Sequence, residues 1–132
     1  MIVDSSALVA IALAQSEARE LLATLIAGPS PRISAANLLE TYLVIDRRGE
    51  QAKAALQEAL TPIGIIVEPV IEAQIEIARD AWRKFGKGSG HPAQLNYGDC
   101  FAYSLARMLD QPLLFVGNDF AQTDIKPALP GQ

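Results

Sequence analysis

Four acidic residues that are far apart in the chain each lie in or beside an apolar stretch: Asp4, Glu40, Asp99 and Asp119. A buried carboxylate without a partner is strongly disfavoured, so each of them needs a basic partner, a raised pKa or a cation. Basic residues are scarce near these positions. Carboxylate oxygens suit Mg²⁺ or Mn²⁺, whereas one cysteine and one histidine are too few for a four-coordinate zinc site. The pattern therefore predicts a site for a hard divalent cation.

A cation held in this way can orient a phosphodiester, lower the pKa of a bound water and stabilise the charge on the phosphate. Hydrolysis of a nucleic-acid backbone is the reaction that this chemistry favours. Three of the acids also have a simpler interpretation, with Asp4 as a helix cap, Asp99 at a helix N-terminus and Asp119 in a turn with Asn118. Glu40 is different, because no cap explains a mid-helix carboxylate among leucines.

Alternating strands and helices must position these acids. We expect strands at 2–3, 32–34, 63–67 and 113–116, and helices at 5–14, 17–27, 35–48, 50–60, 70–85 and 99–109. This alternation predicts a three-layer α/β/α fold with a central, mostly parallel sheet, in which ligands bind beyond the carboxyl ends of the strands. Asp4 and Asp119 would lie at that edge, and Ser5 and Ser6 are the expected caps of the first helix. Glu40 is expected to leave its helix from a face that packs inward.

The composition predicts one domain over residues 1–132, with a short irregular tail from about residue 126. A net charge of -4 argues against a nonspecific nucleic-acid coat, but not against a nuclease whose acidic ligands carry that charge. Cys100 is the only cysteine, which fits a reducing cytoplasm. The apolar run at 7–14 could pass for the core of a signal peptide, but Asp4 and no basic residue precede it, and it is too short to span a bilayer. We therefore expect a buried first helix in a cytoplasmic protein that does not act in a membrane.

Four ordered motifs cover most of the chain. They are MIVDSSAL at 1–8, SAANLLE at 34–40, LNYGDCFAY at 95–103 and LFVGNDF at 114–120, the last followed by TDI at 123–125. In these motifs the chain resembles the PIN-domain ribonucleases and, more narrowly, the VapC toxins of type II toxin-antitoxin systems. The resemblance implies a PIN-like fold and an endoribonuclease that depends on Mg²⁺ or Mn²⁺.

The resemblance also assigns roles to individual residues. Its acidic quartet falls on Asp4, Glu40, Asp99 and Asp119, with Asp4 and Asp99 as the strongest direct metal ligands. It implies that Ser6 is a supporting hydroxyl near the site. The implied partners are an RNA substrate, with tRNA as a candidate, a cognate VapB-type antitoxin and a second copy of the chain in a homodimer.

Two residues are candidates for the fourth acid. Many relatives carry a second acid immediately before the last member of the quartet, where this chain has Asn118. Asp124 is therefore an alternative to Asp119.

Two other functions stay open at this point. A phosphoryl-transfer or receiver domain also uses an acid at a strand end. However, a haloacid-dehalogenase-like phosphatase would need an aspartate at Ser6, and a receiver would need a strand-end lysine in place of Gly117-Asn118-Asp119. A catalytically silent PIN-like binding module is the other alternative, and the presence of all four acids counts against it.

The region from residue 79 to residue 100 offers weaker candidates. A basic stretch could contact either RNA phosphates or an antitoxin, and Gly86–Gly90 lacks the spacing of a phosphate-binding loop. For Trp82 and Phe85, which lie on one helical face, we expect core packing, with a groove for a partner as the alternative. We also expect core packing for Cys100 and a loop hydrogen bond for His91. The basic stretch consists of Arg79, Arg83, Lys84 and Lys87.

Overall fold

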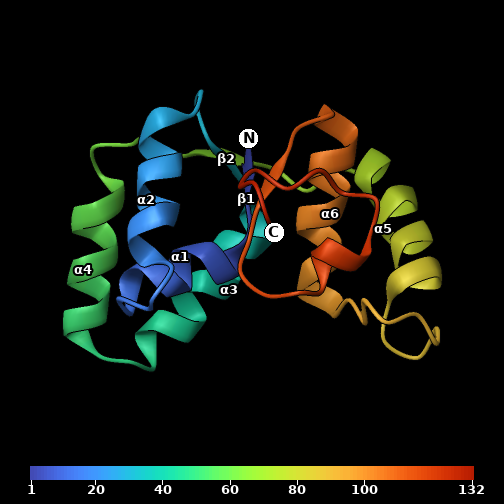
Figure 1. The fold of residues 1–132 in the computed structure, drawn as a ribbon, viewed down its shortest axis with the longest axis horizontal. Helices are drawn as coiled ribbons and strands as arrows, with labels where there is room; N and C mark the ends of the chain where they lie inside the picture. The colour runs from blue at the N-terminus through green and yellow to red at the C-terminus, as the bar shows by residue number, and fades with distance from the viewer.

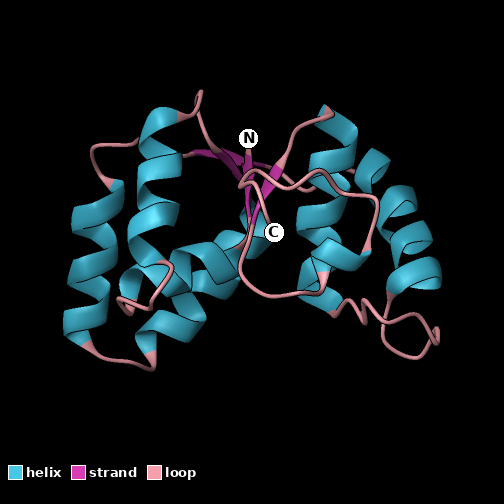
Figure 2. Ribbon diagram, viewed as in Figure 1, coloured by secondary structure: helices cyan, strands magenta, loops and turns pink.

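The computed structural model describes residues 1–132, which alternate short strands with helices (Figures 1 and 2). None of the helices is both long and apolar enough to cross a membrane. The elements in chain order are β1 (Ile2–Val3), α1 (Ser5–Ala12), α2 (Ala18–Ala27), β2 (Arg32–Ser34), α3 (Ala35–Asp46), α4 (Glu50–Leu60), β3 (Ile66–Glu68), α5 (Glu72–Phe85), α6 (Tyr97–Leu109), β4 (Leu113–Leu114) and the 3₁₀ helix η1 (Phe120–Gln122).

The four strands form one parallel sheet in the order β3-β2-β1-β4. Ile2 of β1 is in register with Arg32 of β2 on one side and with Leu113 of β4 on the other. The chain thus moves outward from β1 to β3, and then returns to the far side of β1 to add β4. In a parallel sheet, the carboxyl ends of the strands at such a reversal are the usual place for a ligand site. Here that place lies between β1 and β4.

Helices cover both faces of the sheet, because successive strand residues point to opposite sides. Val3 and Leu114 pack into a core cluster with residues of α1, α2 and α4. Ile2 and Leu113 pack into a second cluster with residues of α5 and α6. Figure 1 shows the two groups of helices on either side of the strands, with α1, α2 and α4 at the left and α5 and α6 at the right. The predicted three-layer α/β/α fold with a parallel sheet is confirmed.

The third strand differs from its predicted position at 63–67. It runs from Ile66 to Glu68, and Ile63 and Gly64 belong to the turn that follows α4. Gly64 has a φ of 68°, a left-handed conformation that interrupts an extended run. Since β3 is an edge strand, Ile66 and Val67 are 39% and 49% exposed.

Several element ends also differ from the predictions. The N-cap of α1 is Asp4 and not Ser5 or Ser6, because the Asp4 side chain accepts a hydrogen bond from the Ser6 N–H. Helix α6 begins two residues earlier than predicted because Asn96 caps it. Helices α1, α3 and α5 are each about two residues shorter than predicted, and the last strand ends at Leu114.

Backbone hydrogen bonds join the tail to β4. Leu113 donates its N–H to the Lys126 carbonyl at 2.9 Å, and its own carbonyl accepts from the Ala128 N–H at 2.8 Å. Pro127 thereby forms a parallel bridge with Leu113. These contacts cover the outer edge of β4, and apart from this bridge residues 126–132 form no helix or strand.

The packing predictions for α5 are only partly correct. Trp82 is 43% exposed, so its expected place in the core is wrong. Phe85 is half-buried and lies edge-to-face on the His91 ring, with centroids 4.9 Å apart. The expected loop hydrogen bond of His91 is present, since its Nδ1 accepts from the Ala93 N–H at 3.1 Å.

Candidate active site

Asp4 follows β1 directly and is 3% exposed. Its Oδ2 accepts hydrogen bonds from the Ser6 N–H at 3.0 Å and from the Ser6 hydroxyl at 2.5 Å, whereas its Oδ1 is buried without a partner. Burial raises the pKa of Asp4 and the charge of Glu40 adds to this, although the Ser6 hydrogen bonds oppose it. One oxygen therefore caps α1, and the other is a buried acceptor available to a cation.

Ser6 links the two strands on either side of the chain reversal. Its hydroxyl donates to Asp4 and accepts a hydrogen bond from the Val116 N–H at 3.0 Å. The backbone adds a further link, because the Asp4 N–H donates to the Leu114 carbonyl at 2.9 Å. These contacts hold the segments that follow β1 and β4 side by side.

Asp99 lies in the first turn of α6 and is held by a capping box. Its N–H donates to Asn96 Oδ1, and its own Oδ2 accepts from the Asn96 N–H, both at 2.9 Å. Burial raises the pKa of Asp99 to about 7 in spite of the Asn96 hydrogen bond, and the charges of Asp4, Asp119 and Glu40 contribute to the rise. The structure thus brings the four predicted acids close enough for three of their charges to act on the fourth.

Glu40 is half-buried on α3 and is held at Oε1. This oxygen accepts from the Ser5 hydroxyl at 2.5 Å and lies 3.3 Å from Asn37 Nδ2, which donates to it. The leucines next to Glu40 in the sequence do not share these surroundings, because Leu39 and Leu43 are 58% and 57% exposed. The buried face of α3 is formed instead by Asn37, Thr41 and Ile45.

Asp119 and Asp124 have different surroundings. Asp119 is exposed at the start of η1, and its side chain does not cap this helix. Asp124 accepts a hydrogen bond from the Tyr103 hydroxyl at 2.7 Å and lies 3.7 Å from the Arg107 guanidinium. Since Asp124 is engaged by α6, the geometry favours Asp119 as the fourth acid.

The donor set fits a cation that keeps part of its water shell. No three of the His, Cys, Asp and Glu side chains are arranged to hold a metal ion by themselves. Mg²⁺, however, usually takes only one or two carboxylates directly and retains several waters. The buried, unpartnered Asp4 Oδ1 and the raised pKa of Asp99 are what such a cation would compensate.

Four supporting residues escaped prediction: Ser5, Asn37, Asn96 and Gly98. Asn96 had a detectable signal, since an asparagine three residues before an aspartate is typical of a capping box. Asn37 precedes Glu40 by three residues and so shares its helix face. No local pattern indicates the contact of Asn37 with Gly98, which is 61 residues away.

The basic stretch on α5 is partly neutralised. Arg79 pairs with Glu76 at 2.9 Å, and Arg83 pairs with Asp80, each one turn apart on the exposed face. Cys100 is buried as expected, and burial raises the pKa of its thiol to about 11, which does not suit a nucleophile.

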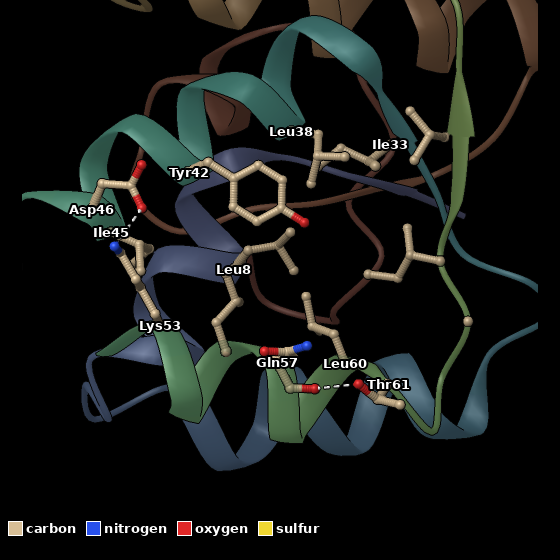
Figure 3. Close-up of a pocket in the computed structure, with 14 residues that line it drawn as sticks. Leu8, Ile33, Leu38, Tyr42, Ile45, Asp46, Lys53, Gln57, Leu60 and Thr61 are labelled. Carbon is tan, nitrogen blue, oxygen red and sulfur yellow. Dashed lines mark hydrogen bonds and ion pairs between the residues drawn. The ribbon is translucent and has the colours of Figure 1, made fainter. Parts of the chain in front are cut away.

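A separate groove of about 570 Å³ lies between α1, α3, α4 and β3 (Figure 3). Its walls are mostly apolar. Leu38 and Tyr42 of α3 face Leu60 of α4 across it, and Leu8 of α1 is fully buried beneath them. Lys53 and Asp46 form an ion pair at its rim, with 3.6 Å between the charged atoms.

Comparison with known proteins gives consistent matches over nearly the whole chain. Residues 1–126 match the PIN domain family. Ribonuclease VapC42 of Mycobacterium tuberculosis is 44% identical over 97% of this chain and 98% of its own length. Ribonuclease VapC28 of the same organism is 44% identical over 98% of both. The crystal structure of M. tuberculosis VapC20, titled a Sarcin-Ricin loop cleaving toxin, superposes with a TM-score of 0.70, 19% identity and coverage of 94% and 95%, which supports the fold.

Proposed function

The chain belongs to the PIN domain family and, within it, to the VapC ribonucleases, and we propose that its four acids form the metal site with which it hydrolyses RNA as the toxin of a toxin-antitoxin pair. PIN-domain ribonucleases in general depend on divalent metal ions. The observation that carries the proposal is the buried and unpartnered Asp4 Oδ1. The pKa of Asp99 adds support, because burial and the charges of Asp4, Asp119 and Glu40 raise it to about 7. The family assignment removes the phosphatase and receiver alternatives.

Mg²⁺ is the proposed ion, with Mn²⁺ as a substitute. When bound, it supplies a water of lowered pKa and stabilises negative charge on the phosphate. Asp4 and Asp99 would hold it directly, because Ser6 and Asn96 each fix one carboxylate oxygen and leave the other. Glu40 and Asp119 would act through water and orient it toward the phosphate.

The proposed substrate is a cellular RNA cut within the chain, and tRNA is the first class to test. The exposed position of Asp119 leaves the site open on one side, as an endonuclease on a folded RNA requires. The proposed location is the cytoplasm, where such RNAs would be its substrates.

A VapB-type antitoxin is the proposed inhibitor, and we assign its docking segment to the groove of Figure 3. Tyr42 and Val67 line this groove and are each 49% exposed, so an apolar helix or strand laid into it would bury them. Tyr42→Glu should weaken co-purification with the antitoxin and leave RNA cleavage intact. Undiminished co-purification would place the antitoxin elsewhere.

A homodimer is proposed through a second face of α3, beside the one that lines the groove. Leu39 and Leu43 lie one turn apart there and are both more than half exposed, and neighbouring exposed apolar side chains of this kind are typical of an interaction surface. Analytical ultracentrifugation should show a dimer for the parent and a monomer for Leu43→Lys. A dimer that survives this change would exclude this face.

The catalytic proposal is tested with Asp4→Asn and Asp99→Asn, and Asp80→Asn serves as a control on the exposed face of α5. The parent and the control should cleave tRNA with Mg²⁺ or Mn²⁺ and stop in EDTA, and both site variants should be inactive while keeping their circular dichroism spectra. If metal-loaded Asp4→Asn cleaved as fast as the parent, the acid assignment would be wrong. If the parent neither cleaved RNA nor bound either metal in calorimetry, the chain would be a silent PIN-like module.

A further inference from the structure

Gly98 lies in the first turn of α6, immediately before Asp99, and packs directly on Glu40. A Cβ at this position would be 2.9 Å from Glu40 Cδ, 3.0 Å from Oε1 and closer still to Oε2. The backbone itself does not require glycine, because Gly98 is not among the residues of positive φ. The space that a side chain would fill is therefore occupied by the Glu40 carboxylate.

Asn37 completes the contact from the α3 side. It is fully buried, and its Nδ2 donates to the Gly98 carbonyl at 2.9 Å and to Glu40 Oε1 at 3.3 Å. Its Oδ1 is buried without a partner. A half-satisfied amide is costly in the interior, so its presence indicates that the contacts it does make are needed.

We propose that Asn37 and Gly98 are positioning residues that seat the Glu40 carboxylate against the first turn of α6 and thereby fix its distance from Asp99. Glu40 and Asp99 come from different helices, and Asn37 is the side chain that hydrogen-bonds Glu40 and the start of α6 at once. Their relative placement decides how a shared cation and its waters are held, and displacements of about 1 Å at such sites can lower a rate 100-fold. This inference rests on the proposed function only for its catalytic consequence.

Gly98→Ala is the test, and metal-free protein gives the first readout. Alanine favours a helix over glycine, but here the added methyl must push Glu40 away from Ser5 and Asn37. The change in Tm caused by Gly98→Ala should therefore be more negative in the parent than in a Glu40→Ala background, where the carboxylate is absent. Equal changes in the two backgrounds would overturn the proposal, even if the protein had no nuclease activity.

Metal affinity and kinetics give the second readout. Gly98→Ala should weaken Mn²⁺ binding several-fold and lower kcat at least tenfold with little change in KM. The double variant of Gly98→Ala with Glu40→Asp should recover part of the lost kcat, because the aspartate side chain is one methylene shorter and leaves room for the added methyl. Asn37→Ala should lower kcat in the same way. Parent kinetics in Gly98→Ala, or a defect that Glu40→Asp leaves untouched, would contradict the positioning role.

Gly88→Ala is the matched control. Gly88 is exposed, has a φ of 88° and has nothing within 4 Å of a built Cβ. The substitution should lower Tm through backbone strain and leave kcat unchanged. If the unsubstituted protein did not cleave RNA, the proposed function would be refuted. The comparison of Tm values with and without Glu40 would still test the positioning role of Gly98.

Discussion

Raising the pH should weaken the fold of the metal-free protein, and Asp99 is a principal cause. Burial and the charges of neighbouring acids raise its pKa from 3.8 to about 7. Between these two pH values the folded protein holds a proton that the unfolded chain has released, so the free energy of unfolding falls as the pH rises. Below this window both states are protonated, and above it both are ionised, which confines the loss to the window.

The size of the loss follows from the two pKa values. At about 1.4 kcal/mol per pH unit, the window corresponds to at most about 4 kcal/mol. Asp99 is only half-buried, so water screens part of this and we expect about 2 kcal/mol. For a domain of this size, that is a fall of roughly 6 to 10 °C in Tm.

The Asp99→Asn variant isolates the contribution of the Asp99 charge to this pH dependence. Asparagine keeps an acceptor oxygen for the Asn96 N–H but carries no charge at any pH. Thermal unfolding in EDTA from pH 4 to pH 8 should give similar Tm values for the parent and the variant at pH 4, and a higher Tm for the variant at pH 8. Asp4, whose pKa burial also raises, should leave a smaller slope of the same sign in the variant.

Two results would refute this reasoning. Parallel Tm profiles for the parent and Asp99→Asn would show that the Asp99 charge does not oppose folding. A cation bound among the acids should also raise the parent's Tm at pH 8 more than that of the variant. Equal stabilisation of both by Mg²⁺ would therefore contradict the site as well.

Three further outcomes are expected. Ser6→Ala removes one hydrogen bond to Asp4 and leaves the Val116 N–H without a partner. Urea denaturation should therefore show a free energy of unfolding lower by about 2 kcal/mol, and unchanged stability would contradict the link between β1 and β4. Tyr103→Phe removes the hydrogen bond to Asp124, which should cost about 1 kcal/mol without affecting RNA cleavage, whereas a cleavage defect would return Asp124 to the list of site acids. Cys100 should react with iodoacetamide at pH 8 far more slowly than in the urea-unfolded chain, because burial raises its pKa to about 11, and equal rates would show that the thiol is exposed.

Much of the fold was predictable because its boundaries are marked locally. Helix α4 lies where it was expected, from Glu50 to Leu60, since Gly49 precedes it and Pro62 follows it closely. Strand β3 was misplaced because a β-branched run does not reveal where a positive φ at Gly64 will break it. Hydrophobic pattern alone also could not show that β3 is an edge strand with exposed side chains.

Within the site, the positions of Asp4 and Asp99 were predictable from local sequence, whereas the surroundings of Glu40 were not. Asp4 and Asp99 lie at the ends of elements, where sequence gives their position to within a residue or two. Their capping roles were offered as alternatives to a metal role, yet each carboxylate caps with one oxygen and leaves the other. The surroundings of Glu40 depend on how α3 meets α6, and contacts between helices that are distant in sequence carry no local signature.

The strand order has a consequence for the synthesis of this ribonuclease. β1 is made first but lies between β2 and β4, so one of its two edges has no partner until the last strand has emerged from the ribosome. Asp119, the last of the four acids, follows that strand, and Ser6 completes its hydrogen bonds only with Val116. A nascent chain that stops short of this point has neither a finished sheet nor a finished acidic site. Closure of the sheet and completion of the acidic site thus depend on the same late segment of the chain, residues 113–119.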